Sequence, residues 1–139
     1  MKTFIATSAL LLCMTVTSIA GVLEDASRFT VRVKTSIEYA FAEDKAGTIR
    51  GAGFLVDANK GLIVTNAHVS GRGNARIEVA FKGQQYQSAK TIYVDPNLDI
   101  AILQLDPSNL LNEAVTAKLE CSDRELNGLD VAAYGHPHD

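Results

Sequence analysis

The sequence has 139 residues, of which 47% are hydrophobic and 21% charged, with a formal net charge of −3 at pH 7. This is the composition of an ordinary globular protein, and it excludes a disordered chain and a collagen-like or low-complexity repeat. The basic residues form no cluster, so we expect neither a nucleic-acid partner nor binding to an anionic membrane surface.

The first twenty residues have the features of a secretory signal peptide. Lys2 is their only charged residue, and an uncharged run follows it as far as Ala20. The small residues Ser18 and Ala20 occupy the positions that a signal peptidase requires for a cut before Gly21. We therefore expect residues 1–20 to be a signal peptide, the protein to be exported to the periplasm or secreted, and residues 21–139 to fold as one domain without a membrane anchor.

A lipidated cysteine is the alternative reading of this leader. Cys13 follows a leucine-rich stretch, but Leu12 precedes it where a small residue would be needed, so the signal peptide is favoured. Cys121 is the one cysteine outside the leader, which excludes an internal disulfide in the mature chain. We expect Cys121 to be a half-buried thiol without a catalytic role.

Beyond the leader, the hydrophobic pattern predicts strands more often than helices. A short helix is expected over 22–28, and 38–50 is expected to be a loop. Alternating or continuous apolar runs, separated by turns such as Asn59-Lys60-Gly61, predict six strands. These strands are expected at 30–35, 51–57, 62–65, 77–81, 85–94 and 100–105.

Strands at these spacings predict an all-β fold, a small antiparallel barrel. The last of the six, 100–105, is uniformly apolar, which predicts a strand buried on both faces. Residues 106–127 are expected to be a linker with one helical turn near Leu110 and Leu111. Residues 128–134 resemble the first strand of a further sheet.

Two polar residues occur next to apolar strands of this pattern. His68 follows the strand at 62–65, and Asp99 directly precedes the strand at 100–105. Strand ends of a rigid barrel commonly carry site residues. By itself, a histidine here is more often a hydrogen-bonded surface residue, and an aspartate here is more often a turn or strand-edge acid. The spacing alone does not show that the two meet.

Four segments carry a family resemblance. They are residues 51–54 (Gly-Ala-Gly-Phe), 61–69 (Gly-Leu-Ile-Val-Thr-Asn-Ala-His-Val), 95–103 (Asp-Pro-Asn-Leu-Asp-Ile-Ala-Ile-Leu) and 131–137 (Val-Ala-Ala-Tyr-Gly-His-Pro). In this order and spacing they resemble the N-terminal portion of a trypsin-like serine protease of the bacterial HtrA/Deg-like branch. The resemblance implies a first barrel plus the start of a second, an incomplete double barrel, with the second barrel truncated after about residue 139.

The resemblance also implies roles for the two polar residues. His68 would be the general base, and Asp99 the acid that orients it. The chemistry agrees, because a serine hydroxyl needs a base, and an imidazole takes and returns a proton near neutral pH. Asp99 is preferred to Asp95, because Asp95 precedes Pro96 in a turn whereas Asp99 adjoins the apolar strand.

The nucleophile expected of this family is missing from the sequence. No Gly-x-Ser-x-Gly motif occurs, and Ser70, Ser88, Ser108 and Ser122 all have unsuitable surroundings. The expected function is therefore that of an exported serine endopeptidase acting on polypeptides, present as a fragment without its nucleophilic serine. The alternative is a non-catalytic remnant or binding module that keeps the barrel. The sequence does not decide whether this chain is an enzyme or whether it forms an oligomer.

Other candidate sites in the sequence are weak. His136 and His138 have no neighbouring cysteine or acidic cluster that would complete a metal site, so no metal is expected. Gly51 and Gly53 are not followed by a helix, which favours close packing of the backbone over phosphate binding. No cofactor is implied.

Overall fold

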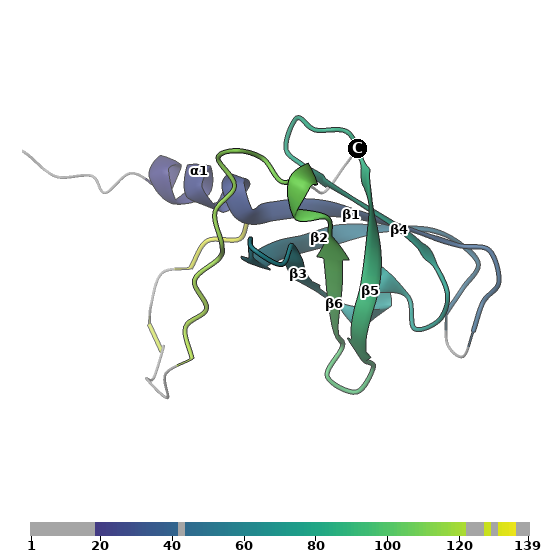
Figure 1. The fold of residues 1–139 in the computed structure, drawn as a ribbon. Helices are drawn as coiled ribbons and strands as arrows, with labels where there is room; N and C mark the ends of the chain where they lie inside the picture. The colour runs from purple at the N-terminus through teal and green to yellow at the C-terminus, as the bar shows by residue number, and fades with distance from the viewer. Residues whose placement is uncertain (1–18, 42–43, 122–126, 129–130, 136–139) are drawn as a thin grey trace, which may run out of the picture.

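The computed structural model describes residues 19–41, 44–121, 127–128 and 131–135. These residues form a closed barrel of six antiparallel strands, preceded by a helix (Figure 1). The predicted all-β fold with an antiparallel barrel is confirmed. A closed barrel leaves no sheet edge unpaired, which gives the strand ends a rigid support.

Nine elements make up the described part of the chain. In chain order they are α1 (Ile19–Phe29), β1 (Thr30–Ile37), β2 (Gly47–Asp57), β3 (Leu62–Thr65), α2 (Ala67–Ser70), β4 (Arg76–Phe81), β5 (Gln87–Asp95), β6 (Ile100–Leu105) and the 3₁₀ turn η1 (Pro107–Asn109). Around the barrel the strands follow the order β1, β2, β3, β6, β5, β4, and β4 closes the ring by pairing with β1.

The interior of the barrel is filled by residues at alternate positions of the strands. In β1, Val31 and Val33 are fully buried, while Arg32 and Lys34 lie on the outer face and are half-buried. This alternation is the one that the sequence predicts for 30–35. The buried apolar cluster comprises Val31, Val33, Leu55, Ile63, Val69, Ile77, Val79, Phe81, Ala89, Leu103 and Leu105.

Strand β2 begins at Gly47, so the prediction of a loop over the whole of 38–50 was wrong. Residues 47–50 pair with the end of β1, from Ile37 opposite Gly47 to Lys34 opposite Arg50. Gly47, Thr48 and Arg50 are exposed. This part of the strand is therefore stabilised by backbone pairing with β1 and not by burial, which is why the hydrophobic pattern does not reveal it.

Strand β6 is buried on one face only, contrary to the prediction for 100–105. Ala101, Leu103 and Leu105 are buried, whereas Ile100 and Gln104 are exposed. The wall of a single barrel has one inner and one outer face, so an apolar run in it still alternates between core and surface.

The turn between β2 and β3 has the predicted position. Gly61 has a φ of +64°, and a β-carbon there would collide with the carbonyl oxygen of Leu105. Because the two backbones lie so close, the N–H of Leu105 can donate to the carbonyl of Gly61, at 2.9 Å. The turn thus connects the β2–β3 hairpin to the end of β6.

The chain after β6 runs back along the barrel past α1 (Figure 1). The N–H of Ala117 donates to the carbonyl of Leu55 at 2.7 Å, and Arg28 Nε of α1 donates to the carbonyl of Glu113 at 2.9 Å. The helical turn expected near Leu110 and Leu111 occurs slightly earlier, as η1.

Two predictions at the ends of the chain have different outcomes. Helix α1 (Ile19–Phe29) is confirmed and is longer than the predicted 22–28. Of the strand predicted over 128–134, residues 131–134 form no strand, and 129–130 lie outside the described residues. Among the helices that the structure describes, none has the length and apolar character needed to cross a membrane.

Candidate active site

His68 and Asp99 meet because β3 and β6 are antiparallel neighbours. Thr65, at the end of β3, lies opposite Ala101 near the start of β6. The residues that follow Thr65 and those that precede Ala101 therefore leave the sheet at the same end. His68 comes three positions after Thr65 and Asp99 two positions before Ala101, so the sheet register brings together two residues that lie 31 positions apart in the sequence.

His68 is carried by the single helical turn α2, which the sequence pattern did not predict. The turn begins after Asn66, whose carbonyl accepts from the N–H groups of Val69 and Ser70, both at 3.1 Å. It ends at Gly71, where φ is +76°. Ala67 and Val69 are buried against the barrel. Because His68 lies between these two anchors, its side chain points outward, and 60% of it is exposed.

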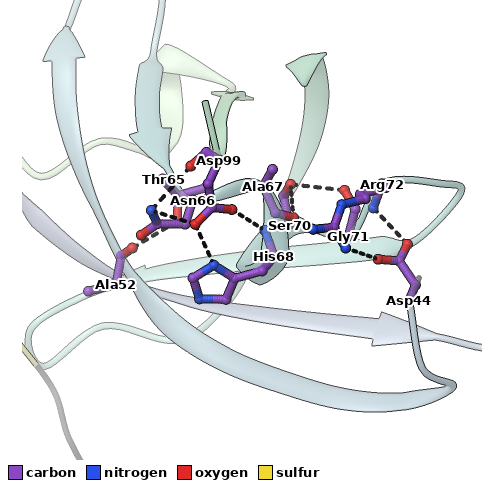
Figure 2. A network of polar contacts seen from close by, with 10 residues as sticks. All are labelled: Asp44, Ala52, Thr65, Asn66, Ala67, His68, Ser70, Gly71, Arg72 and Asp99. Carbon is purple, nitrogen blue, oxygen red and sulfur yellow. Dashed lines mark hydrogen bonds and ion pairs between the residues drawn. The ribbon is translucent and has the colours of Figure 1, made fainter. Parts of the chain in front are cut away.

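Asp99 contacts His68 through both of its carboxylate oxygens (Figure 2). The backbone N–H of His68 donates to Oδ1 at 2.9 Å, and Nδ1 of the imidazole lies 2.7 Å from Oδ2. The Asp99 side chain is 40% exposed, and the residue directly adjoins the start of β6, as expected. Asp99 is held by hydrogen bonds, because it precedes β6 and lies outside the barrel interior.

These contacts stabilise the charged form of Asp99. The backbone N–H of His68, and after it the imidazole, hold the pKa of Asp99 below the usual range of an aspartate. The side-chain amide of Asn66 lowers this pKa further, while partial desolvation opposes the shift. Hydrogen bonds that favour the ionised form are the dominant cause.

The geometry fixes which nitrogen of His68 is free to act as a base. An ionised carboxylate only accepts hydrogen bonds, so Nδ1 must carry the proton that lies between the ring and Asp99. In the neutral ring, Nε2 is then the unprotonated nitrogen. The arrangement gives an oriented imidazole whose Nε2 can accept a proton.

The contacts of two of the serines considered above, and the exposure of the cysteine, can be described. Ser70, two residues from His68, is fully buried, and its hydroxyl donates to the carbonyls of Ala67 and Gly71. The hydroxyl of Ser108 donates to Asp106 at 2.7 Å. Ser122 lies outside the described residues. Cys121 is exposed, so the prediction that it is half-buried was wrong.

A second polar contact, which the sequence does not reveal, holds the chain just after α2. Asp44, from the β1–β2 loop, accepts the N–H of Arg72 at 2.7 Å and lies 3.7 Å from the Arg72 guanidinium (Figure 2). Only 4% of the Asp44 side chain is exposed. A single acid in a loop of mixed charge gives no periodic signal, so nothing in the sequence distinguished it.

No metal centre is found in the part of the chain that the structure describes. Within it, no three residues among His, Cys, Asp and Glu come together in a way that could hold a metal ion. His136 and His138 lie outside the described residues. Asp99 and the imidazole of His68 are hydrogen-bonded to each other.

Known proteins resemble this chain in sequence and in structure. Residues 51–139 match the family described as "Trypsin-like peptidase domain". "Pro-apoptotic serine protease NMA111" of Chaetomium globosum is 31% identical over 78% of this chain, and "Serine protease HTRA1A" of Danio rerio is 34% identical over 67% of it. Among solved structures, "HtrA-type protease AlgW with tripeptide" is 25% identical over 73% of this chain, with a TM-score of 0.57.

This chain is much shorter than the proteins it matches. It spans 11% of the length of the Chaetomium protein, 19% of the zebrafish protein and 30% of the AlgW chain. The family match nevertheless covers His68, Asp99 and all of the strands from β3 onward. The chain belongs to the trypsin-like peptidase family, and the relatives and structures that it resembles include proteases of the HtrA type.

Proposed function

We propose that this chain supplies the base and the orienting acid of an exported serine endopeptidase that acts on polypeptides. The observation that carries the proposal is the 2.7 Å contact between Nδ1 of His68 and Oδ2 of Asp99. Together with the bond from the His68 N–H, this contact directs Nε2 away from the acid. His68 would act as base and then as acid, and Asp99 would keep the ring in the correct tautomer.

The reaction requires a serine that these 139 residues do not supply. In acyl transfer, the serine oxygen bonds to the peptide carbonyl carbon while its proton passes to Nε2 of the base. The amine then leaves with that proton, which gives an acyl-enzyme. Water next adds to the acyl carbon while Nε2 takes its proton, and the serine oxygen leaves with that proton to release the carboxylic acid product. Because the sequence contains no Gly-x-Ser-x-Gly, the nucleophile and the oxyanion-binding amides would have to come from a longer polypeptide that includes this chain.

A second candidate function is a binding module or remnant that keeps the barrel without the chemistry. The same absence of a nucleophile motif favours it, as does the exposure of 60% of the His68 side chain and 40% of the Asp99 side chain. An exposed dyad without a positioned substrate gains little from general-base catalysis.

The test compares this chain with a polypeptide extended through a downstream Gly-x-Ser-x-Gly. Both proteins are incubated with casein and with a fluorophosphonate that labels activated serines. We expect only the extended form to hydrolyse and to be labelled, and to lose both properties with His68→Ala. Asp99→Asn should lower its turnover by about 10⁴-fold, because the imidazole then loses its orienting acid. Absence of hydrolysis by the extended form, or hydrolysis that survives His68→Ala, would contradict the proposal.

A further inference from the structure

Asn66 stands at the position that caps α2, but its side chain does not cap the helix. An asparagine here would ordinarily accept a hydrogen bond from an N–H of the first turn. Its Nδ2 is instead directed at Asp99, and lies 3.2 Å from the carbonyl oxygen and 3.2 Å from Oδ2 of that residue. Oδ1 of Asp99 accepts the first-turn N–H of His68 instead.

Asp99 has an unusual backbone conformation. Its φ is +54°, which makes it the one residue other than glycine with a positive φ in the described part of the chain. Aspartate tolerates this left-handed region better than most residues, but the conformation persists only where surrounding contacts impose it. Asn66 contacts the main-chain carbonyl and the carboxylate of the same residue, so a single amide group ties the backbone of Asp99 to the direction of its side chain.

We propose that Asn66 is a positioning residue, which holds Asp99 in its left-handed conformation with Oδ2 directed at Nδ1 of His68. The inference rests on the roles proposed above for His68 and Asp99, but it concerns a geometry that exists without substrate. Asn66 is exposed and fills no core space, so its contribution is directional.

The distribution of donors around Asp99 shows what the amide adds. Oδ1 accepts the N–H of His68, while Oδ2 accepts both the imidazole and the Asn66 amide. With 40% of the side chain exposed, water competes for Oδ2. Removing the amide leaves the imidazole as the one protein donor to Oδ2 in these contacts, and leaves the Asp99 carbonyl without the link that joins it to the carboxylate.

Substitutions at Asn66 separate this role from helix capping. Serine is as good a capping residue as asparagine, but it is too short to reach Asp99. Asn66→Ser therefore preserves the capping preference and removes the contact, and Asn66→Ala removes both. The matched control is Asn97→Ser in the turn before Asp99, where the backbone N–H of Asn97 makes the contact to Asp95.

The measurement is made by NMR on the 139-residue chain, without substrate. Ring ¹⁵N shifts of His68, assigned with His68→Ala, report the tautomer at a pH where the ring is neutral. The ¹³C shift of the Asp99 carboxyl reports its titration. In the unsubstituted chain and in Asn97→Ser we expect mainly the Nδ1–H tautomer. In both Asn66 variants we expect a mixture of tautomers, and a titration midpoint of Asp99 shifted upward from that of the unsubstituted chain, because one donor to its carboxylate is lost.

Two outcomes would overturn the proposal. One is that Asn66→Ser keeps the tautomer and the Asp99 titration of the unsubstituted chain, which would show that the Asn66 amide does not position Asp99. The other is that both Asn66 variants lose the dispersed amide spectrum of the barrel, which would show a general structural role. Neither readout uses catalysis, so failure of the extended protein to hydrolyse casein would count against the proposed function and leave this result unaffected.

Discussion

Gly51 of β2 lies directly against Val69 of α2. A β-carbon at position 51 would stand 2.7 Å from both methyl carbons of Val69, closer than packed atoms approach. Val69 is buried next to His68, so the missing side chain of Gly51 allows the turn that carries the imidazole to pack flat on the barrel. The close packing predicted for Gly51 from the sequence is confirmed by this contact.

Replacing Gly51 with alanine should therefore strain α2. We expect Gly51→Ala to lower the free energy of unfolding by about 1–3 kcal/mol, because the added methyl group overpacks the contact with Val69. In a chain that already carries Val69→Ala, the same substitution should cost less, since the colliding methyl groups are gone. Urea denaturation of the four proteins measures both effects. An equal cost in the two backgrounds would place the strain elsewhere.

Asp99 should make the free energy of unfolding depend on pH in the acid range. Its folded-state contacts lower its pKa, so between the folded and unfolded pKa values the unfolded chain binds more protons and stability rises with pH. The contribution is fully present above the unfolded value of about 3.9 and is lost as the pH falls through the folded value. Asp99→Asn lacks it at every pH.

We therefore expect the difference in unfolding free energy between the unsubstituted chain and Asp99→Asn to shrink as the pH falls below about 4. Glu78 and Asp106 also have lowered pKa values, but they are present in both proteins and cancel in the difference. Urea midpoints between pH 2.5 and 7 provide the measurement. A difference that stays constant down to pH 2.5 would show that the carboxylate contacts contribute nothing.

Asp44 should stabilise the end of α2 through the Arg72 backbone. Asp44→Ala removes a nearly buried charged acceptor from the Arg72 N–H, which we expect to cost about 1.5–3 kcal/mol. Asp44→Asn keeps an oxygen at the same place and should cost less. Thermal and urea unfolding of the two variants test this order, and a greater loss in Asp44→Asn would contradict it.

Export should remove residues 1–20 without disturbing the barrel. The predicted cut before Gly21 falls two residues into α1, whereas Arg28 and Phe29, at its other end, contact the rest of the chain. We expect a secreted product of 119 residues with the same barrel. Intact-mass analysis of the secreted chain checks the cut, and a product that still begins at Met1 would show that no signal peptide is removed.

Periodicity predicted the strands whose burial alternates and failed where other forces decide. It located β1, β3 and β6 because most of the residues that these strands direct into the barrel are apolar. It missed residues 47–50 of β2, which are paired but mostly exposed, and it missed α2, because four residues are too few for a helical period. The burial of β6 was overestimated because a continuous apolar run does not reveal that its outer face reaches solvent.

The candidate site was predictable in its residues but not in its geometry. The family resemblance pointed to His68 and Asp99, and the β3–β6 register brings them together, a relation that no local pattern contains. Asn66 lies in the segment 61–69 that carries the family resemblance, but the resemblance gave it no role. The signal that could have drawn attention to it is its place directly before the helical turn, where a polar residue is expected to have a hydrogen-bonding task. Asp44 gave no such signal.

The pairing of β3 with β6 also has a kinetic consequence. These strands are neighbours in the sheet, but β4 and β5 lie between them along the chain, so their pairing closes a long loop and is expected late in folding. His68 and Asp99 flank this ladder. Until the ladder forms, the imidazole has no acid beside it and cannot hold a single tautomer. A chain that is still unfolded therefore carries both residues without an oriented base, and the oriented imidazole arises only with the finished barrel.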